Sequence, residues 1–349
     1  MSGGNDRREN RPFRSDERAR LDRVGGLPYT CRIPSGRQVP IMIEVTNLTK
    51  SYGKVEAVRG VSFQVPPGEI YGLLGPNGAG KSTTIHIICG LVAASSGEAR
   101  VGGFDIVREP LAAKRILGVV PQQSVVVEEL SAMANCLFFA SLYGVDRSTA
   151  RERARTLLNW MELSDHAGKP AGALSGGMLR RLTLVLGILH QPKALILDEP
   201  TTGLDPQTRL LLLDKIREIA AGGTAVLLTT HHLEEAERLC QRVGIIDGGK
   251  IIKEGTLDGL RAEVQDVQLF SLRGGFSRDT LRTSLARIPG TEVILDAHDE
   301  VVVAAPSTSG QSARLLELAA SLDDVREVTI KPPSLESLFI RLTGRELRE

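Results

Sequence analysis

Nine consecutive residues near position 80 could hold a chain of phosphates. They read GPNGAGKST and fit the pattern G-x-x-x-x-G-K-[ST]. Glycines let the backbone curl so that successive N–H groups point at phosphate oxygens. Lys81 would reach the outer phosphates and the Ser82 hydroxyl would ligate Mg²⁺; a glycine-rich turn with a chance lysine is the structural alternative. The candidate phosphate-binding residues are Gly75, Pro76, Asn77, Gly78, Ala79, Gly80, Lys81, Ser82 and Thr83.

A pair of acidic residues further along the chain supplies the second half of this chemistry. The segment ALILDEP predicts an apolar strand with Asp198 at its carboxyl end, where the carboxylate can hold the magnesium shell. Glu199 follows and points to the other side, which suits a group that orients or deprotonates an attacking water. An apolar strand that ends in Asp-Glu is often only structural, but downstream of a phosphate loop it indicates nucleoside triphosphate hydrolysis.

The elements around these residues predict an α/β fold. The phosphate loop follows the strand IYGLL and opens the helix TTIHIICGL, which is the context that the motif requires. ALILDEP and TAVLLTTHH are apolar runs with polar carboxyl ends, typical of parallel strands buried on both faces. Two more strands are predicted at MIEVTNL and VSFQV. The spacing of apolar residues predicts helices over residues 111–120, 150–163 and 208–220.

A third segment indicates which kind of nucleoside triphosphatase this chain is. Leu174, Ser175, Gly176, Gly177 and Met178 open a predicted helix upstream of Asp198. This segment resembles the signature of the ABC ATPase family, which is Leu-Ser-Gly-Gly usually followed by Gln. Here Met178 takes the place of that Gln, which is a departure from the family pattern. The resemblance covers residues 43 to about 260 with every motif in order. It implies that the signature closes over the γ-phosphate of ATP held by the opposite subunit of a head-to-tail dimer.

Four smaller elements fall where the family has functional residues. Tyr52 resembles the aromatic residue that stacks on adenine, and Gln122 resembles the glutamine that senses Mg²⁺ and links the site to a membrane partner, with Gln123 as the alternative. Asp205 resembles the acidic loop residue that crosses the dimer interface. His231 resembles the histidine that contacts the γ-phosphate, with His232 as the alternative. The resemblance implies ATP and Mg²⁺ as cofactors. It places the metal at Ser82, Gln122 and Asp198, and catalysis at Lys81, Gln122, Glu199 and His231.

The chain divides into three predicted parts. Residues 1–41 are charged with little apolar periodicity, which predicts a disordered extension or an arm on anionic lipid. Residues 42–262 form the ATPase domain: a mostly parallel core sheet with antiparallel β and helical subdomains. Residues 263–349 show the order β-α-β-β-α-β of a small ferredoxin-like α+β domain, followed by a helix capped by Ser334. The end of the chain resembles the tail of drug and antibiotic exporter ATPases of the daunorubicin-resistance type.

Composition limits the remaining function classes. Lys and Arg total 43 against 42 Asp and Glu, so the net charge of +1 gives no support to a protein that coats nucleic acid. The sequence contains no apolar run of membrane-spanning length. Four distant cysteines predict small buried side chains rather than a disulfide framework.

We therefore expect the ATP-binding subunit of an ABC transporter, peripheral on the cytoplasmic face of the membrane. It would drive export of a drug, antibiotic, polysaccharide or similar amphiphile through a separate permease, contacted by a helical stretch over residues 125–144. The second ATPase subunit would be a copy of this chain or a homologue, and no nucleic acid is expected. The alternatives are an importer ATPase, a soluble ABC ATPase acting on ribosomes or DNA, and a regulatory module without hydrolysis.

Overall fold

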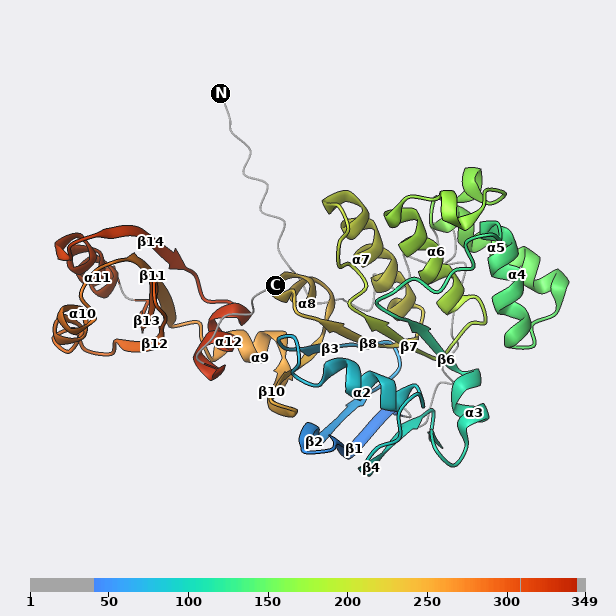
Figure 1. Cartoon of the computed structure of the whole chain (residues 1–349), viewed down its shortest axis with the longest axis horizontal. Coiled ribbons are helices and arrows are strands. Elements are labelled where there is room, and N and C mark those ends of the chain that lie inside the picture. Colours follow the sequence, from blue (N-terminus) through green and yellow to red (C-terminus); the bar gives the residue numbers. More distant parts are fainter. Residues whose placement is uncertain (1–40, 308, 344–349) are drawn as a thin grey trace, which may run out of the picture.

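A six-stranded sheet forms the centre of the computed structural model, which describes residues 41–307 and 309–343 (Figure 1). The strand order is β10-β9-β3-β8-β7-β6, in which only β10 runs antiparallel to its neighbour. Strands β3, β7 and β8 are buried along their whole length, as expected for parallel strands covered on both faces. The bounds are β3 Ile70–Leu74, β6 Leu117–Val120, β7 Ala194–Asp198, β8 Ala225–Thr230, β9 Arg242–Asp247 and β10 Lys250–Thr256. The predicted α/β fold with a mostly parallel core sheet is confirmed.

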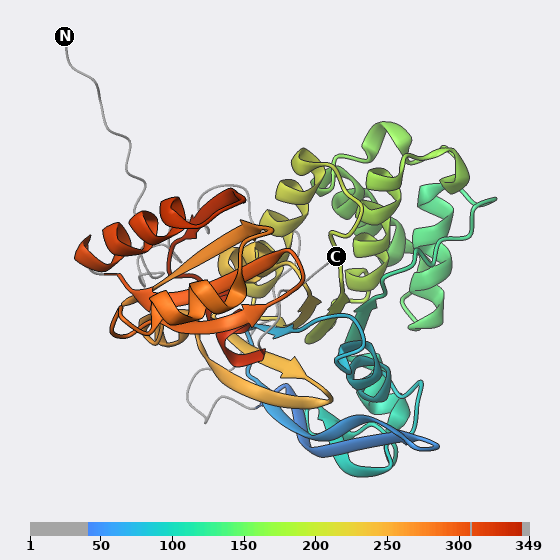
Figure 2. The ribbon, with the colours of Figure 1, turned by 60° about the vertical axis from the view of Figure 1, so that its left-hand side comes forward.

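A second sheet, antiparallel, packs below the first with helix α2 between them (Figures 1 and 2). Its order is β2-β1-β4-β5, with β1 Ile43–Tyr52, β2 Val55–Val65, β4 Ser96–Val101 and β5 Phe104–Asp105. Helix α2 spans Lys81–Ile88 and contributes Ile85, Ile87 and Ile88 to the core between the sheets. This packing fixes the start of α2, and with it the phosphate loop, against β3.

Helices α4 to α9 contribute to the core on the other face of the central sheet, whereas α3 contributes Ala113 to the core between the two sheets. Helices α4 to α6 lie on the opposite side of the central sheet from the C-terminal unit in both views (Figures 1 and 2). Asp146, Ser175 and Asp205 each cap a helix by accepting backbone N–H groups of its first turn. The bounds are α3 Pro110–Arg115, α4 Ala132–Leu142, α5 Arg147–Trp160, η1 Ser164–His166, η2 Ala171–Ala173, α6 Gly176–Ile188, α7 Pro206–Ala221, α8 Leu233–Leu239 and α9 Leu257–Ala262.

Two helical predictions were wrong in part. The stretch 111–120 is helical only to Arg115, because residues 117–120 form β6 and pair with β7. Gly118 lets α6 pack closely on this strand, since a Cβ there would lie 2.3 Å from the carbonyl oxygen of Gly187 on α6. The stretch 125–144 becomes helical only at Ala132. The Asn135 side chain bonds the backbone of Val127 at 2.8 and 3.0 Å and holds the preceding segment as a loop.

The C-terminal unit is a four-stranded antiparallel sheet with two helices on one face. Its order β12-β13-β11-β14 and its sequence β-α-β-β-α-β give the predicted ferredoxin-like topology. The apolar side chains of α10 and α11 cover one face of β11 and β13. The bounds are β11 Val267–Gly274, α10 Arg278–Leu285, β12 Glu292–Asp296, β13 Glu300–Pro306, α11 Ser309–Ser321 and β14 Val325–Lys331.

The last helix, α12 (Leu335–Thr343), joins the two units. Ser334 accepts the Ser337 N–H at 3.2 Å and caps it as expected. Leu335, Leu338 and Phe339 belong to the large core cluster of the ATPase unit, and α12 packs on α8 and α9. Ile340 instead packs on the second face of the C-terminal sheet. The helix therefore contributes to two cores at once.

The predictions about membrane spans and cysteines can be compared with the structure for the described residues. Within residues 41–307 and 309–343, no helix is both long and apolar enough to cross a bilayer. Cys89, Cys136 and Cys240 are buried free thiols, and burial raises the pKa of Cys89 and of Cys136 to about 12. Cys31 and the predicted disordered extension lie outside the described residues, apart from residue 41.

Candidate active site

The phosphate loop connects β3 to α2 at the carboxyl edge of the central sheet. Gly75 and Gly80 must be glycines because backbone from other segments approaches them closely. A Cβ on Gly75 would lie 2.2 Å from the Ile246 carbonyl oxygen, and a Cβ on Gly80 would lie 2.5 Å from the Ala57 carbonyl oxygen. Gly80 also has a φ of 106°, which side chains rarely adopt. The first N–H groups of α2, those of Lys81, Ser82 and Thr83, have no acceptor within the helix. The loop therefore presents a row of donors to an anion.

Lys81 is the buried cation of this loop, with 4% of its surface exposed. Its Nζ donates to the carbonyl oxygens of Gly75 at 2.7 Å and Pro76 at 3.1 Å. It also lies 3.6 Å from Glu199 Oε1. Burial lowers the pKa of Lys81, and the charge of Glu199 opposes this shift. Phosphate oxygens could replace these carbonyl partners, which would leave the charge of the lysine compensated.

Glu199 is the point on which the predicted catalytic residues converge. Its Oε1 lies 3.1 Å from His231 Nδ1, and its Oε2 accepts the Gln122 amide at 3.3 Å. Thr202 Oγ1 donates to the same Oε2 at 3.3 Å. Glu199 has a φ of 44°, a conformation that costs on the order of 1–3 kcal/mol and persists only where the surroundings enforce it. The fold thus holds this carboxylate in place at an energetic cost, next to the predicted phosphate position.

Asp198 lies at the end of β7, beside β8, the strand that ends one residue before His231. Its Oδ1 accepts the Thr229 hydroxyl at 2.5 Å, which leaves Oδ2 for another partner. The Ser82 hydroxyl is exposed at the start of α2, and the Gln122 side chain is exposed at the end of the β6 loop. Two oxygens and a carboxylate of this kind are the hard ligands that Mg²⁺ takes alongside phosphate oxygens. The residues fit a magnesium ion brought in with a nucleotide.

Tyr52 ends β1 and presents an open ring. The side chain is 49% exposed, and Lys50 Nζ lies 5.0 Å from the ring centroid. The β1–β2 hairpin that carries Tyr52 also carries Ala57, whose carbonyl approaches Gly80 of the phosphate loop. An exposed aromatic face beside a phosphate loop can stack on a nucleotide base.

The signature residues and Asp205 form a separate group. Ser175 caps α6 and accepts the Met178 N–H at 3.3 Å; Asp205 caps α7 and accepts the Thr208 N–H at 3.0 Å. The two helix starts are adjacent, since a Cβ on Gly177 would lie 3.1 Å from Thr208. The Thr208 N–H lowers the pKa of Asp205, which therefore carries a negative charge at neutral pH. Leu174 is buried beneath, whereas Ser175 and Gly176 are exposed and could contact another molecule.

Comparison with known proteins agrees with this geometry. A family profile described as ABC transporter matches residues 58–202. The chain is 38% identical over 319 residues to the linearmycin resistance ATP-binding protein LnrL of Bacillus subtilis (strain 168), an alignment that covers 88% of this chain and all of that protein. It is 37% identical to the daunorubicin resistance ATP-binding protein DrrA3 of Streptomyces coeruleorubidus, covering 88% of this chain and 97% of that one. The chain belongs to the ABC transporter ATP-binding family.

A solved structure confirms the fold of the ABC ATPase unit. The structure described as the ATP binding subunit of an ABC transporter is 33% identical, with a TM-score of 0.60. It covers 64% of this chain and 92% of its own length. The chain is thus an ABC-type ATPase that binds ATP, and its similarity to resistance ATPases confirms the predicted resemblance to that subgroup.

Two buried charged residues near the site of this ABC ATPase were not among the predicted site residues. Glu235 on α8 is 3% exposed and accepts the Thr230 hydroxyl at 3.0 Å and the Thr201 hydroxyl. It therefore links the loop after Glu199 to the strand end before His231. Arg180 on α6 is 7% exposed and reaches the loops of Gln122 and Glu199. The spacing of Arg180 from Leu184 and Gly187, four and seven residues along the helix, was a signal that its side chain faces the core.

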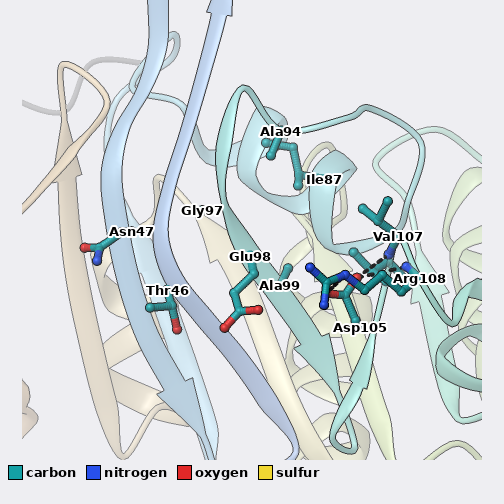
Figure 3. A pocket seen from close by; sticks show the side chains of 11 residues that line it. Thr46, Asn47, Ile87, Ala94, Gly97, Glu98, Ala99, Asp105, Val107 and Arg108 are labelled. Carbon is teal, nitrogen blue, oxygen red and sulfur yellow. Dashed lines mark hydrogen bonds and ion pairs between the residues drawn. The ribbon is translucent and has the colours of Figure 1, made fainter.

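Among the described residues, two of the hollows lie away from the phosphate loop. One, of about 450 Å³, is lined by residues of β1, β4 and the segment after β5 (Figure 3). Its acidic residue Asp105 is occupied, since it accepts the N–H groups of Val107 and Arg108 at 2.8 and 3.0 Å. The other, of about 460 Å³, lies between α7 and α8 and includes His231 and His232. Only the second adjoins the group around Glu199.

Proposed function

We propose that this ATPase hydrolyses ATP at a site built by Lys81, Gln122, Asp198, Glu199 and His231, with Glu199 acting on the water. The observation that carries the proposal is the set of contacts made by the Glu199 carboxylate with Lys81, Gln122 and His231. A carboxylate held 3.1 Å from an imidazole nitrogen can accept a water proton or orient the water in line with the γ-phosphate. Catalysis is then mainly positioning and charge stabilisation.

The remaining nucleotide contacts follow once the γ-phosphate is placed next to Glu199. The phosphate loop would hold the phosphates, and the ring of Tyr52 would stack on adenine. Ser82, Gln122 and Asp198 would hold Mg²⁺, which when bound neutralises phosphate charge. Lys81 would leave the carbonyls of Gly75 and Pro76 for phosphate oxygens, and this exchange also releases Glu199 from its charge contact with Lys81.

We further propose that the working form is a head-to-tail dimer. The support is the exposure of Ser175 and Gly176 at a helix start adjacent to that of Asp205, in a group separate from the contacts around Glu199. A second copy or a homologous subunit would supply these groups to the γ-phosphate. The Ser175 hydroxyl and the first N–H groups of α6 are the donors suited to that anion.

Export through a separate membrane subunit is the proposed use of this cycle. The relatives with resistance in their names support export, and an antibiotic, drug or similar amphiphile is the cargo class in keeping with them. Helix α4 and the loop before it expose apolar side chains close in sequence to Gln122: Val125 at 41%, Phe138 at 45% and Leu142 at 65%. We propose that this surface contacts the permease and holds the ATPase at the cytoplasmic face of the membrane.

The dimer scheme is tested with Glu199→Gln. This variant keeps the contacts of the phosphate loop and removes the carboxylate, so we expect turnover to fall by roughly 10²–10⁴-fold while ATP traps a stable dimer. Light scattering after size exclusion, with and without saturating Mg-ATP, measures the dimer, and Lys81→Ala is the control that should not respond to ATP. A Glu199→Gln chain that stays monomeric at saturating ATP would count against the scheme.

The transport partner is tested by affinity purification of the tagged chain from detergent-solubilised membranes. We expect a stoichiometric membrane protein whose recovery falls when Phe138 and Leu142 are both replaced by Ser. Recovery with a periplasmic solute-binding protein would instead favour an importer. Recovery only with ribosomes or DNA would overturn the transport proposal and leave the ATP chemistry intact.

A further inference from the structure

Arg180 occupies an unusual position between the signature helix and the catalytic loops. It lies on α6, five residues after Ser175, and its side chain is buried. Its guanidinium donates to five backbone carbonyl oxygens on two separate segments, the loop after β6 and the end of β7 with the loop that follows it. These are Pro200 from Nε at 2.6 Å, Pro121 and Gln122 from Nη1 at 2.5 and 3.0 Å, and Asp198 and Glu199 from Nη2 at 3.1 and 3.0 Å.

These hydrogen bonds restrain the backbone of two predicted catalytic residues, Gln122 and Glu199. The first loop follows β6 and carries Gln122; the second follows β7 and carries Glu199. Burial lowers the pKa of Arg180 to about 10, so the side chain still carries its charge at neutral pH. Carbonyl dipoles and the charge of Asp198 compensate that charge, and only the planar five-donor fork of an arginine can reach both segments at once. The bond to the Glu199 carbonyl acts on the residue whose φ of 44° requires external restraint.

We propose that Arg180 is a positioning residue that couples the signature segment to the hydrolytic site of the same chain. Movement of the start of α6, when Ser175 engages the ATP of the opposite subunit, passes through this side chain to the backbones of Gln122 and Glu199. The two sites of a dimer would then be linked through α6 of each chain. The inference rests on the roles proposed above for Ser175, Gln122 and Glu199.

The neighbouring arginine offers a matched control. Arg181 is on the same helix and also bonds backbone, donating to the Met161 carbonyl at 2.9 Å. Its ion pair is with Glu162 at 3.6 Å, just beyond the end of α5. Its side chain is 13% exposed, so it is nearly as buried as Arg180. Loss of Arg181 therefore removes a similar kind of interaction without altering the loops of Gln122 and Glu199.

The experiment compares Arg180→Lys, Arg180→Gln and Arg181→Lys in the full chain, with Mg-ATPase activity measured over a range of ATP concentrations. A lysine keeps the charge but cannot bond both loops. We expect Arg180→Lys to lower kcat by about 10- to 100-fold while KM stays within about twofold, because displacement of catalytic groups by an ångström costs this much and the phosphate loop is untouched. Arg181→Lys is expected to keep most of kcat. Equal losses in Arg180→Lys and Arg181→Lys, or a rise in KM with kcat unchanged, would overturn the proposal.

A double-mutant cycle separates coupling from local support. If Arg180 transmits the signature contact, Arg180→Lys should reduce kcat by a much smaller factor in a Ser175→Ala background than in the wild type. Equal factors in both backgrounds would overturn the coupling. Failure of both Arg180 variants to fold, judged by thermal unfolding, would assign the residue to the fold and also overturn it. Persistent hydrolysis by Glu199→Gln would instead refute the proposed function, whereas a dead Glu199→Gln beside a fully active Arg180→Lys refutes only this inference.

Discussion

Phe339→Ala tests whether the last helix of the chain is part of the ATPase core. Phe339 lies 77 residues beyond the end of α9, yet its side chain is fully buried in the core cluster that contains Leu239 and Leu260. Helix α12 is also bonded to α8, because the Leu335 N–H donates to Glu237 Oε1 at 2.9 Å. Truncation of this phenyl ring should therefore destabilise the ATPase unit and not only the C-terminal sheet.

The size of the effect follows from complete burial. Replacement of a buried Phe by Ala typically costs about 3–5 kcal/mol through lost transfer energy and the remaining cavity. At roughly 2–4 °C per kcal/mol for a unit of this size, the melting temperature should fall by about 6–20 °C. The matched control is Phe276→Ala: Phe276 is 5% exposed and is buried in the cluster under α10 and α11 instead.

Hydrogen exchange with mass spectrometry shows where each variant loses stability. Phe339→Ala should speed exchange in β7 and β8, next to Glu199 and His231, and added Mg-ATP should restore part of the protection because ligand stabilises the folded ATPase unit. Phe276→Ala should speed exchange in β11 and β13 and leave β7 and β8 unchanged. Loss of protection only in β11 and β13 for Phe339→Ala would refute the assignment of α12 to the ATPase core.

Two further outcomes are expected. Tyr52→Ala should weaken ATP binding by about 1–3 kcal/mol, the usual contribution of a base stacked on an aromatic ring, whereas Tyr52→Phe should bind ATP like the wild type. Equilibrium binding of a fluorescent ATP analogue measures both, and equal affinities in all three proteins would rule out stacking. Burial, together with nearby Arg153, lowers the pKa of His190 from 6.5 to about 4, against a smaller opposing effect of the Leu117 carbonyl. The unfolded chain then binds the proton more readily, so stability is full above pH 6.5 and falls with acidification, by about 2 kcal/mol between pH 7 and pH 5. Urea unfolding of His190→Gln at both pH values should show this loss reduced by that amount; an unchanged loss would contradict it.

Much of the chemistry could be predicted from the sequence because it depends on local pattern. The phosphate loop needs glycines and a lysine at fixed spacing between a strand and a helix, and residues 75–83 contain them together with their flanking elements. The same holds for Asp198 and Glu199 at the end of an apolar strand, and for Ser175 at a helix start. These motifs bind through backbone N–H groups and helix ends, so their geometry is set within about ten residues.

Other features depended on pairing and packing between distant segments. Residues 117–120 have helical periodicity, but they form an edge strand because β7 offers hydrogen bonds and Gly118 allows close approach to Gly187. A periodic pattern cannot distinguish these outcomes when a short apolar run can be satisfied in either way.

The tertiary structure alone decided what surrounds Glu199. Lys81, Gln122 and His231 lie on three different segments, and only the order of the strands in the central sheet brings them to one carboxylate. The five carbonyls around Arg180 and the burial of Phe339 beside α8 are likewise set by contacts across long sequence separations. The sequence by itself determined which groups could bind and cleave a nucleoside triphosphate. The fold decided which of them contact one another, because that depends on how separate elements bury their apolar faces together.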